Sequence, residues 1–519
     1  MKVSLIAFLL TTCFGLTLLA QKNIAILNFQ ADNGFQHSSK LKALSMVEKI
    51  CKQNNWHVVS SIDTAYLDSD NLQQFDVIVF NNMCGNEGRI FSTQQQKAIQ
   101  AFIRNGGGFV GIHCAGAIWQ EDGAFQDWYE KLIGTRLVDH PQVEKARLIL
   151  ENKYSFWTNT FPKEWVIEDE WHRFAYNPRP YVNVLLSLDE NSYDGKQKLG
   201  GDHPFTWYQY FDGGRSFFTA IGHSNAIYED ANFQELVKRG IYWASGKAPD
   251  IFGVPVTAGL LLDLDANHGI NLEDGDRVIS WQNQAPSSNV KDFVKQDIGR
   301  TPAGSGRPTL QKKSVNAGEN NTVVFHQQEL VNDDDCAFDH LTTGSGYTWF
   351  SVMAVNTQTP HVPGVNAFFG NLRNSNVNNQ GNYEGFWAGL SDDNKVWMGT
   401  RNALSFGRWD ENNPLVIDSR PLTKGQYYVV MGRMGAGREK AKLELFINNT
   451  LPVSEALIRV NTSADPAVMA IGQERDASNH PGNESFDGEI SRFLIFERPL
   501  SAHEMTQVLA YLKEKYRIK

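Results

Sequence analysis

Residues 106–116 read GGGFVGIHCAG. The glycines are expected to end a helix, because glycine readily takes the left-handed backbone conformation that follows a last helical turn. The apolar run Phe109–Ile112 follows at once, and a short apolar run bounded by glycine is typical of a strand buried on both faces. The run passes directly into His113. This segment therefore predicts a buried strand with a histidine at its carboxyl end.

The same order of strand, loop and helix extends along the chain in both directions, from about Asn23 to Gly246. Strand candidates alternate with amphipathic segments whose apolar residues recur every three or four positions. Such alternation predicts an α/β domain with a mostly parallel sheet. The predicted strands are residues 24–29, 58–59, 77–80, 109–112, 146–150, 182–188 and 216–221, and the predicted helices include residues 41–51, 98–103 and 233–244.

Histidines follow several of these strands. His37 lies in the loop after the first strand, and His113 and His223 come directly after later strands. Ligands of parallel α/β sheets bind beyond the carboxyl ends of the strands, so histidines at three separate strand ends predict one shared site. Further histidines lie between these positions, at His140, His172 and His203.

Seven segments, taken in order, carry a family resemblance. Together they resemble the ThuA-like, or trehalose-utilisation, family. The resemblance implies a class I glutamine-amidotransferase-like fold with a flavodoxin-like, doubly wound sheet, and a loose association with carbohydrate metabolism. The segments are residues 34–39, 106–113 (GGGFVGIH), 169–172 (DEWH), 177–179 (NPR), 202–207 (DHPFTW), 222–223 (GH) and 240–246 (GIYWASG).

The cysteines argue against amidotransferase chemistry. Amidotransferases place a nucleophilic cysteine on a tight turn after a strand, whereas His113 stands at that position here and Cys114 comes one residue later. A shift of one residue on such a turn points the side chain elsewhere. We therefore expect the widely spaced cysteines to be buried free thiols. They are Cys51, Cys84, Cys114 and Cys336.

After a linker at 249–255, the pattern changes to short strands separated by Gly, Asn, Asp and Pro clusters, which predicts an all-β domain. Residues 259–266 (GLLLDLDA) and 492–516 resemble the two ends of a laminin-G-like, concanavalin A-like jelly roll. This resemblance implies a β-sandwich that binds glycans through exposed aromatic rings, with Trp387, Trp397 and Trp409 as candidates. The predicted domains are residues 21–248 and 256–519.

The first twenty residues predict export. Lys2 precedes an apolar run from Val3 to Ala20, a pattern typical of a signal peptide at residues 1–20. No later segment is apolar enough to span a membrane. We therefore expect a periplasmic or secreted protein. The net charge of the chain is −10, which argues against nucleic acid or an anionic membrane as a partner over a broad face.

An exported α/β domain joined to a lectin-like sandwich favours an enzyme of polysaccharide degradation, with a polysaccharide or oligosaccharide substrate. The first hypothesis is a lyase that cleaves a uronate-containing glycan by β-elimination. His113, His172 or His223 would abstract the C5 proton, and Tyr176 or Tyr208 would protonate the leaving oxygen. The residues predicted to bind substrate are Arg173, Arg179, His37, His203, Trp207, Trp387 and Trp397.

Three alternatives stay open. Metal-dependent hydrolysis would use several of the same histidines with a carboxylate to hold a divalent cofactor such as zinc or calcium. Hydrolysis by two carboxylates could use Asp169, Glu170 and Asp202. A chain without catalysis would be a glycan-binding protein. The β-elimination hypothesis by itself requires no cofactor.

Overall fold

The structure is a computed structural model, and its described residues fall into two compact units. One comprises the described residues within Met1–Ile149, Phe161–Asn177 and Leu186–Ala248, and the other comprises those within Leu150–Thr160, Pro178–Leu185 and Pro249–Lys519. No helix among the described residues is long and apolar enough to cross a membrane. The predicted signal peptide lies outside them. The described residues are 23–32, 34–84, 90–118, 123–151, 157–162, 164–247, 253–273, 275–286, 288–295, 306–334, 336–375, 382–405, 407, 409–474 and 483–519.

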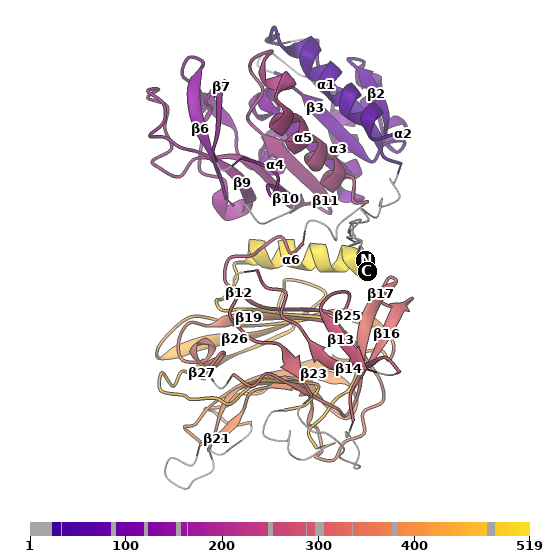
Figure 1. The fold of residues 1–519 in the computed structure, drawn as a ribbon, viewed down its shortest axis with the longest axis vertical. Helices are drawn as coiled ribbons and strands as arrows, with labels where there is room; N and C mark the ends of the chain where they lie inside the picture. The colour runs from indigo at the N-terminus through magenta and orange to yellow at the C-terminus, as the bar shows by residue number, and fades with distance from the viewer. Residues whose placement is uncertain are drawn as a thin grey trace, which may run out of the picture. The chain divides into compact units, whose positions relative to one another are not determined.

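The first unit is an α/β domain, as predicted (Figure 1). Within its described residues, nine strands form one sheet in the order β2-β1-β3-β4-β11-β10-β9-β6-β7. These strands are β1 Ala25–Phe29, β2 His57–Ser61, β3 Val77–Asn81, β4 Gly108–Ile112, β6 Glu144–Leu150, β7 Trp165–Asp169, β9 Asn183–Leu188, β10 Pro204–Phe211 and β11 Gly214–Thr219, and β5 Leu137–Asp139 pairs separately with β8 Arg173–Phe174. The helices are α1 Lys40–Gln53, α2 Ser69–Leu72, α3 Thr93–Arg104, α4 Gly123–Ile133 and α5 Ala231–Ala244.

The sheet is mixed rather than mostly parallel. From β2 to β11 the neighbouring strands run parallel, but β10 is antiparallel to β11 and β6 is antiparallel to β7. The cause at β10 is a two-residue connection, Asp212-Gly213, in which both residues have positive φ angles of 47° and 93°. Such a connection forms a tight hairpin, whereas a parallel pair would need a long crossover.

Helices cover both faces of this sheet. The indole of Trp207 in β10 donates a hydrogen bond to the carbonyl of Ile133 in α4, while the next residue, Tyr208, packs its ring against Trp243 of α5. Adjacent residues of a strand point to opposite faces, so α4 and α5 lie on opposite sides. The glycine that begins β4 fits this packing, because a β-carbon at Gly108 would overlap the carbonyl oxygen of Ala244 in α5.

The second unit is an all-β domain, as predicted, and its strands pair into one large antiparallel network. β19 Tyr347–Val355 pairs with both β25 Tyr427–Met434 and β29 Asp487–Phe496. The buried core between the strands is rich in aromatic rings, including Trp281, Trp349 and Phe369. The helix α6 Ala502–Lys515 begins with a capping box formed by Ser501 and Glu504.

The strands of the second unit are β12 Leu260–Asp265, β13 Ile270–Glu273, β14 Arg277–Trp281, β15 Phe293–Val294, β16 Thr309–Ser314, β17 Asn320–His326, β18 Leu330–Val331, β19 Tyr347–Val355, β20 Asn366–Gly370, β21 Arg373–Ser375, β22 Asn382–Leu390, β23 Lys395–Asn402, β24 Val416–Pro421, β25 Tyr427–Met434, β26 Lys440–Ile447, β27 Ser454–Arg459, β28 Ala470–Ile471 and β29 Asp487–Phe496.

Candidate metal centre

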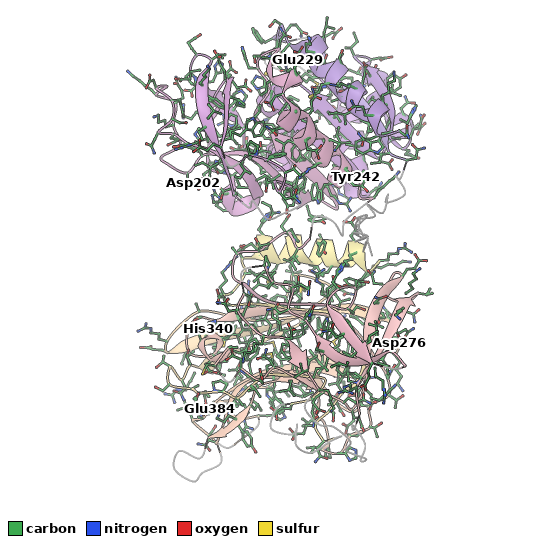
Figure 2. The ribbon with its side chains drawn as sticks, viewed as in Figure 1. Asp202, Glu229, Tyr242, Asp276, His340 and Glu384 are labelled. Carbon is green, nitrogen blue, oxygen red and sulfur yellow. A yellow bond between two sulfur atoms is a disulfide. The ribbon has the colours of Figure 1, made fainter. Side chains whose placement is uncertain are left out.

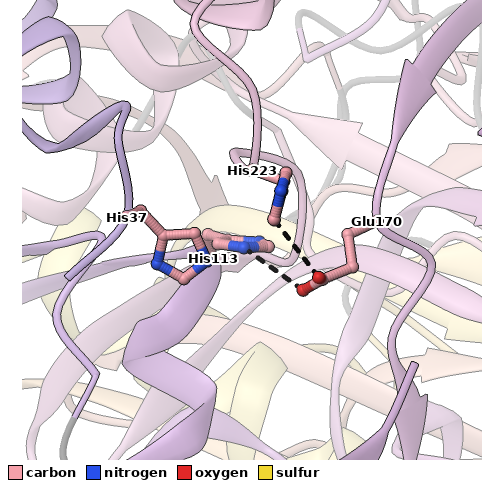
Figure 3. A group of neighbouring side chains, drawn as sticks. All are labelled: His37, His113, Glu170 and His223. Carbon is pink, nitrogen blue, oxygen red and sulfur yellow. Dashed lines mark ion pairs between the residues drawn. The ribbon is translucent and has the colours of Figure 1, made fainter. Parts of the chain in front are cut away.

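Four side chains meet where strands of the α/β sheet end. His37 comes from the loop after β1, His113 follows β4, Glu170 follows β7 and His223 follows β11. Each offers one ligand atom, and these atoms all lie within 4.8 Å of one another. Figure 3 shows His113 and His223 joined to the Glu170 carboxylate by dashed lines, with His37 beside His113. We call these four residues the His₃Glu cluster.

His113 is held with one ring nitrogen directed into the cluster. Its Nδ1 donates a hydrogen bond of 2.7 Å to the carbonyl oxygen of Ala220, so Nε2 carries the free lone pair. Nε2 lies 3.6 Å from Glu170 Oε2 and has no hydrogen-bond partner among the described residues. Burial lowers the pKa of this imidazole well below its usual value, and the neighbouring His172 and His37 lower it further. His113 is therefore a neutral ring, which is the form that binds metal.

Glu170 is the anionic centre of the cluster. Its oxygens lie 3.2 Å from His223 Nδ1 and 3.0 Å from His140 Nδ1, and His172 Nε2 donates to Oε2 at 3.2 Å. Burial alone would raise the pKa of the Glu170 carboxyl, but the bonds to His172 and His223 outweigh burial and hold the pKa far below its usual value. The contact with Glu170 in turn raises the pKa of His223.

Asp169 fixes the positions of its neighbours. Its carboxylate accepts hydrogen bonds of 2.8 Å from the backbone N–H groups of Gly222 and His223 and of 2.9 Å from that of Glu170. It is fully buried, and burial raises its pKa to about 6 against the effect of these bonds. Asp169 therefore connects the ends of β7 and β11 and is not directed into the cluster as an acid or base.

A second set of hydrogen bonds connects the loop of His37 with that of His223. Ser39 occupies the N-cap position of α1 without capping the helix. Its hydroxyl instead donates to the carbonyl of His223 at 2.7 Å and accepts from Asn82 Nδ2 at 3.0 Å. Tyr228 donates to the Gly222 carbonyl at 2.6 Å. The sequence marks Ser39 only as part of the segment 34–39, because its partner His223 lies 184 residues away.

The cysteines differ from the prediction. Cys84 and Cys114 form a disulfide, with their Cα atoms 4.8 Å apart, because they follow the adjacent parallel strands β3 and β4. Cys51 is buried and free, as expected, whereas Cys336 is free but exposed. A disulfide-bonded Cys114 cannot act as a nucleophilic thiolate. The nearest His37 nitrogen, Nδ1, lies 3.4 Å from Cys84 Sγ and 3.7 Å from Cys114 Sγ.

The structure brings together four of the predicted histidines, namely His37, His113, His172 and His223. The fifth, His203, is fully buried behind them. Its Nε2 donates to the backbone carbonyl of His172 at 2.8 Å, and its Nδ1 lies 2.9 Å from Glu190. The prediction that His203 binds substrate is therefore wrong, because the ring supports the backbone of His172.

Several other predicted residues lie in packing or pairing roles. Trp207 and Tyr208 are buried between the sheet and its helices, so Trp207 cannot contact a sugar. Arg173 forms two hydrogen bonds with Asp139, at 2.8 and 2.7 Å, and Arg179 pairs with Glu151 at 2.8 Å. Both guanidinium groups thus face carboxylates of the protein itself.

Two predicted residues remain partly exposed. Tyr176 is 38% exposed, and its carbonyl accepts a hydrogen bond from Thr135. Asp202, labelled in Figure 2, accepts a hydrogen bond of 2.8 Å from Asn177. Their predicted roles stay predictions.

The tryptophans of the second unit form a packed cluster. Trp387 and Trp397 are only 2% and 1% exposed, so the prediction that their rings stack on a glycan is wrong. Trp409 is 38% exposed and stacks on Trp387 with ring centroids 5.8 Å apart. Buried indoles here support the one exposed ring.

The His₃Glu cluster fits a zinc-like cation. Ligands about 2.0–2.2 Å from a tetrahedral zinc ion lie about 3.4 Å from each other. The Glu170 oxygens lie 3.6 Å from His113 Nε2 and 3.2 Å from His223 Nδ1. The donor set combines a neutral, correctly oriented imidazole with an anionic carboxylate, which suits Zn²⁺ and other divalent transition metals.

Comparisons with known proteins agree with the predicted family resemblance. Residues 25–244 match the ThuA family model, described as trehalose utilisation. No curated protein matches the chain. A ThuA-like protein from Bacteroides uniformis is 20% identical, with a TM-score of 0.37, and the match covers 43% of this chain and 92% of that one. For a ThuA-like protein from Parabacteroides merdae the identity is 17% and the TM-score 0.36, with coverage of 43% and 90%.

Proposed function

Residues 25–244 form a ThuA-like domain, and we propose that this domain is a divalent-metal-dependent enzyme that acts on carbohydrate. The observation that carries the proposal is the His₃Glu cluster, in which four potential ligand atoms lie within 4.8 Å of one another. The description of the matching family as trehalose utilisation supports carbohydrate as the class of substrate. With the expected leader at 1–20, the enzyme would be exported, and the proposed substrate is an oligosaccharide or polysaccharide.

A buried imidazole nitrogen without a hydrogen-bond partner destabilises the folded protein unless a ligand binds to it. Nε2 of His113 and Nδ1 of His172 have no hydrogen-bond partner among the described residues, although both rings are fully buried. An unsatisfied buried polar atom costs about 1–3 kcal/mol. A bound cation would satisfy the lone pair of His113 and would balance the charge of Glu170.

We propose hydrolysis of a glycosidic bond as the reaction. A bound divalent cation acts as a Lewis acid and makes a water molecule nucleophilic at neutral pH. The protein would supply proton transfer through His140, whose side chain is 42% exposed and whose Nδ1 lies 3.0 Å from Glu170. His172 orients Glu170 through its Nε2–H group, and Asp169 holds the loops in place.

β-Elimination is the second candidate. It needs a neutral base, and burial lowers the pKa of both His113 and His172. It also needs a positive charge to neutralise the uronate carboxylate. Arg173 and Arg179 are paired with carboxylates, so the cation at the cluster would take that role.

The test begins with metal content. Metal bound to the purified full-length chain is measured by mass spectrometry, before and after dialysis against a chelator. Activity is then measured on neutral and uronate-containing polysaccharides, with Zn²⁺, Mn²⁺ or Ca²⁺ restored. We expect Glu170→Gln and His113→Ala to lose the metal and the activity, whereas His57→Ala, at an exposed position on β2, keeps both.

The products separate the candidates. New reducing ends without ultraviolet absorbance support hydrolysis, and the absorbance of an unsaturated uronate supports elimination. Activity that survives complete removal of metal would contradict the proposal. Metal binding with retention on a glycan column, but without any product, would show a glycan-binding protein instead of an enzyme.

A further inference from the structure

A second group of potential metal ligands shares one residue with the His₃Glu cluster. His37, Cys84 and Cys114 also offer ligand atoms within 4.8 Å of one another. In the structure the two sulfur atoms are joined as a disulfide, and a disulfide sulfur carries no thiolate charge. We propose that reduction of this disulfide creates a separate site, His37 with two thiolates, that binds a soft divalent cation such as zinc.

The two distances from the His37 ring nitrogen to the sulfur atoms fit this ligand set. A tetrahedral zinc ion with one nitrogen ligand and one sulfur ligand separates these two atoms by about 3.6 Å. His37 Nδ1 lies 3.4 Å from Cys84 Sγ and 3.7 Å from Cys114 Sγ. One ring nitrogen therefore faces both sulfur atoms at ligand spacing. Both cysteines are nearly buried, with exposures of 4% and 5%, so the site is shielded from bulk water.

The fold makes the two sulfur positions independent of the disulfide. β3 and β4 are hydrogen-bonded neighbours, with Asn81 opposite Ile112. Cys84 and Cys114 follow these strand ends by three and two residues, so the sheet holds both cysteines at the same edge whether or not they are bonded. Reduction should therefore leave both thiols beside His37.

The chemistry balances with a dithiol or phosphine as the reductant. The reductant supplies two electrons, the S–S bond breaks, and each sulfur takes up one proton. Binding of the cation then displaces both protons and leaves two thiolates and neutral His37 as ligands. Thiolates are softer ligands than carboxylates and favour zinc strongly.

The consequence for the His₃Glu cluster rests on the proposed function. His37 stands between both groups, with ring centroids 4.9 Å from His113 and 5.0 Å from His223. In the oxidised chain it can serve the His₃Glu cluster. In the reduced chain the thiolates compete for His37 and for the cation, so reduction would draw metal away from Glu170.

Cobalt(II) distinguishes the two sites, because only thiolate ligands give an intense cobalt charge-transfer band in the near ultraviolet. The full-length chain carrying Cys336→Ser, which removes the exposed thiol, is titrated with cobalt before and after reduction with a phosphine. We expect the band only in the reduced chain. We also expect Cys84→Ser/Cys114→Ser to abolish it, and His37→Gln to weaken thiolate-bound cobalt by at least about tenfold.

A reduced chain that binds no cobalt through thiolate would overturn the inference, as would a His37→Gln variant with unchanged affinity. Oxidised and reduced samples of one chain give the comparison even if a serine variant fails to fold. Cobalt binding by the oxidised chain, without the band, reports on the His₃Glu cluster alone. If the oxidised chain binds no cobalt, the proposed function fails while the thiolate site is unaffected. If the oxidised chain binds cobalt but the reduced chain shows no thiolate band, the thiolate site fails while the proposed function is unaffected.

Discussion

Both units bury charged side chains, but the buried groups are paired in the second unit and incompletely paired in the first. In the second unit, Arg492 donates to Asp263 at 2.9 and 2.7 Å and lies 3.1 Å from Asp265. Lys515 of α6 reaches Asp265 at 2.9 Å, and Tyr511 accepts from Arg492 at 2.8 Å. Every charge in this network faces an opposite charge. In the first unit, the His₃Glu cluster leaves His113 Nε2 without a hydrogen bond from any described residue.

The difference separates a structural network from a candidate site. Although burial opposes ionisation of Asp265, Arg492 and Lys515 hold its pKa well below the usual value. That network connects β12, β29 and α6, and nothing further is needed to satisfy it. The His₃Glu cluster is equally well positioned, by Asp169 and Ser39, yet His113 Nε2 lacks a hydrogen-bond partner among the described residues although four potential ligand atoms lie within 4.8 Å of one another. Buried polar side chains that are held in fixed positions but lack hydrogen-bond partners indicate a bound ligand.

The largest effect is expected from Glu170→Gln. The amide keeps the shape of the side chain but removes the negative charge that balances a cation. We expect metal affinity to fall more than about 100-fold, beyond the loss typical of residues that only support a ligand, and activity to fall with it. Calorimetric titration of zinc into the apoprotein measures this. An unchanged metal affinity would mean that the Glu170 carboxylate is not a ligand and has a structural role, like the buried carboxylates of the second unit.

Arg492→Met should strongly destabilise the second unit. The change leaves two buried aspartates without their main partner, and breaking a buried ion pair costs about 3–5 kcal/mol. Denaturant unfolding, followed by tryptophan fluorescence, measures the loss. Arg438→Met, at an exposed position, is the matched control and should have little effect. Metal binding by the first unit should survive both changes.

Acid should destabilise the first unit before the second. Burial lowers the pKa of His37 to about 4 and also lowers that of His113, His172 and His203. These rings have a higher pKa when unfolded, near 6.5, so their contribution is complete above that pH and is lost as the pH falls towards 4. Asp169, with its pKa raised to about 6, and His223, whose pKa is raised by Glu170, act in the opposite direction, but they are two groups against four.

We therefore expect the metal-free first unit to lose more than about 1.4 kcal/mol between pH 7 and pH 5, the equivalent of one pKa unit in one group. Denaturant unfolding of the apoprotein at several pH values gives the measurement. Stability that rises over this range on acidification would show that Asp169 and His223 dominate and that the other histidines are not neutral.

The smallest effect is expected from Ser39→Ala. The variant removes the bond to the His223 carbonyl and leaves Asn82 with the weaker contact to Gly222 at 3.4 Å. We expect a loss of about 1 kcal/mol in stability and a 10- to 100-fold loss in metal affinity. Ser69→Ala, at an exposed residue with a 3.5 Å contact, is the control. A stability loss without any change in affinity would make Ser39 a packing residue only.

Local patterns predicted much of the site. The apolar run before His113 and the one before Gly222 mark β4 and β11, and parallel neighbours in a sheet end at the same edge. That rule placed His37, His113 and His223 together before any contact was known. Glu170 was found only as one of three carboxylates, because nothing in its spacing says which of them faces the histidines.

Other features depended on partners that are distant in the sequence. The disulfide needed β3 and β4 to be neighbours, and the arginine pairs needed Asp139 and Glu151 to approach. The amino-acid sequence is compatible with either exposed or buried rings at Trp387 and Trp397. Only the packing of the second unit shows that both are buried. His203 shows the same limit, since its role follows from a hydrogen bond to His172.

The sequence by itself determined the two kinds of domain, the ThuA-like resemblance and the histidines at strand ends, because periodicity and strand termini are local properties. Only the tertiary structure decided which of those histidines converge on Glu170, which charges are already satisfied and which cysteines meet. The physical reason is that hydrogen bonds, ion pairs and metal coordination act over a few ångströms in space. Of the residues that make them here, Asp265 and Lys515 lie 250 positions apart in the sequence.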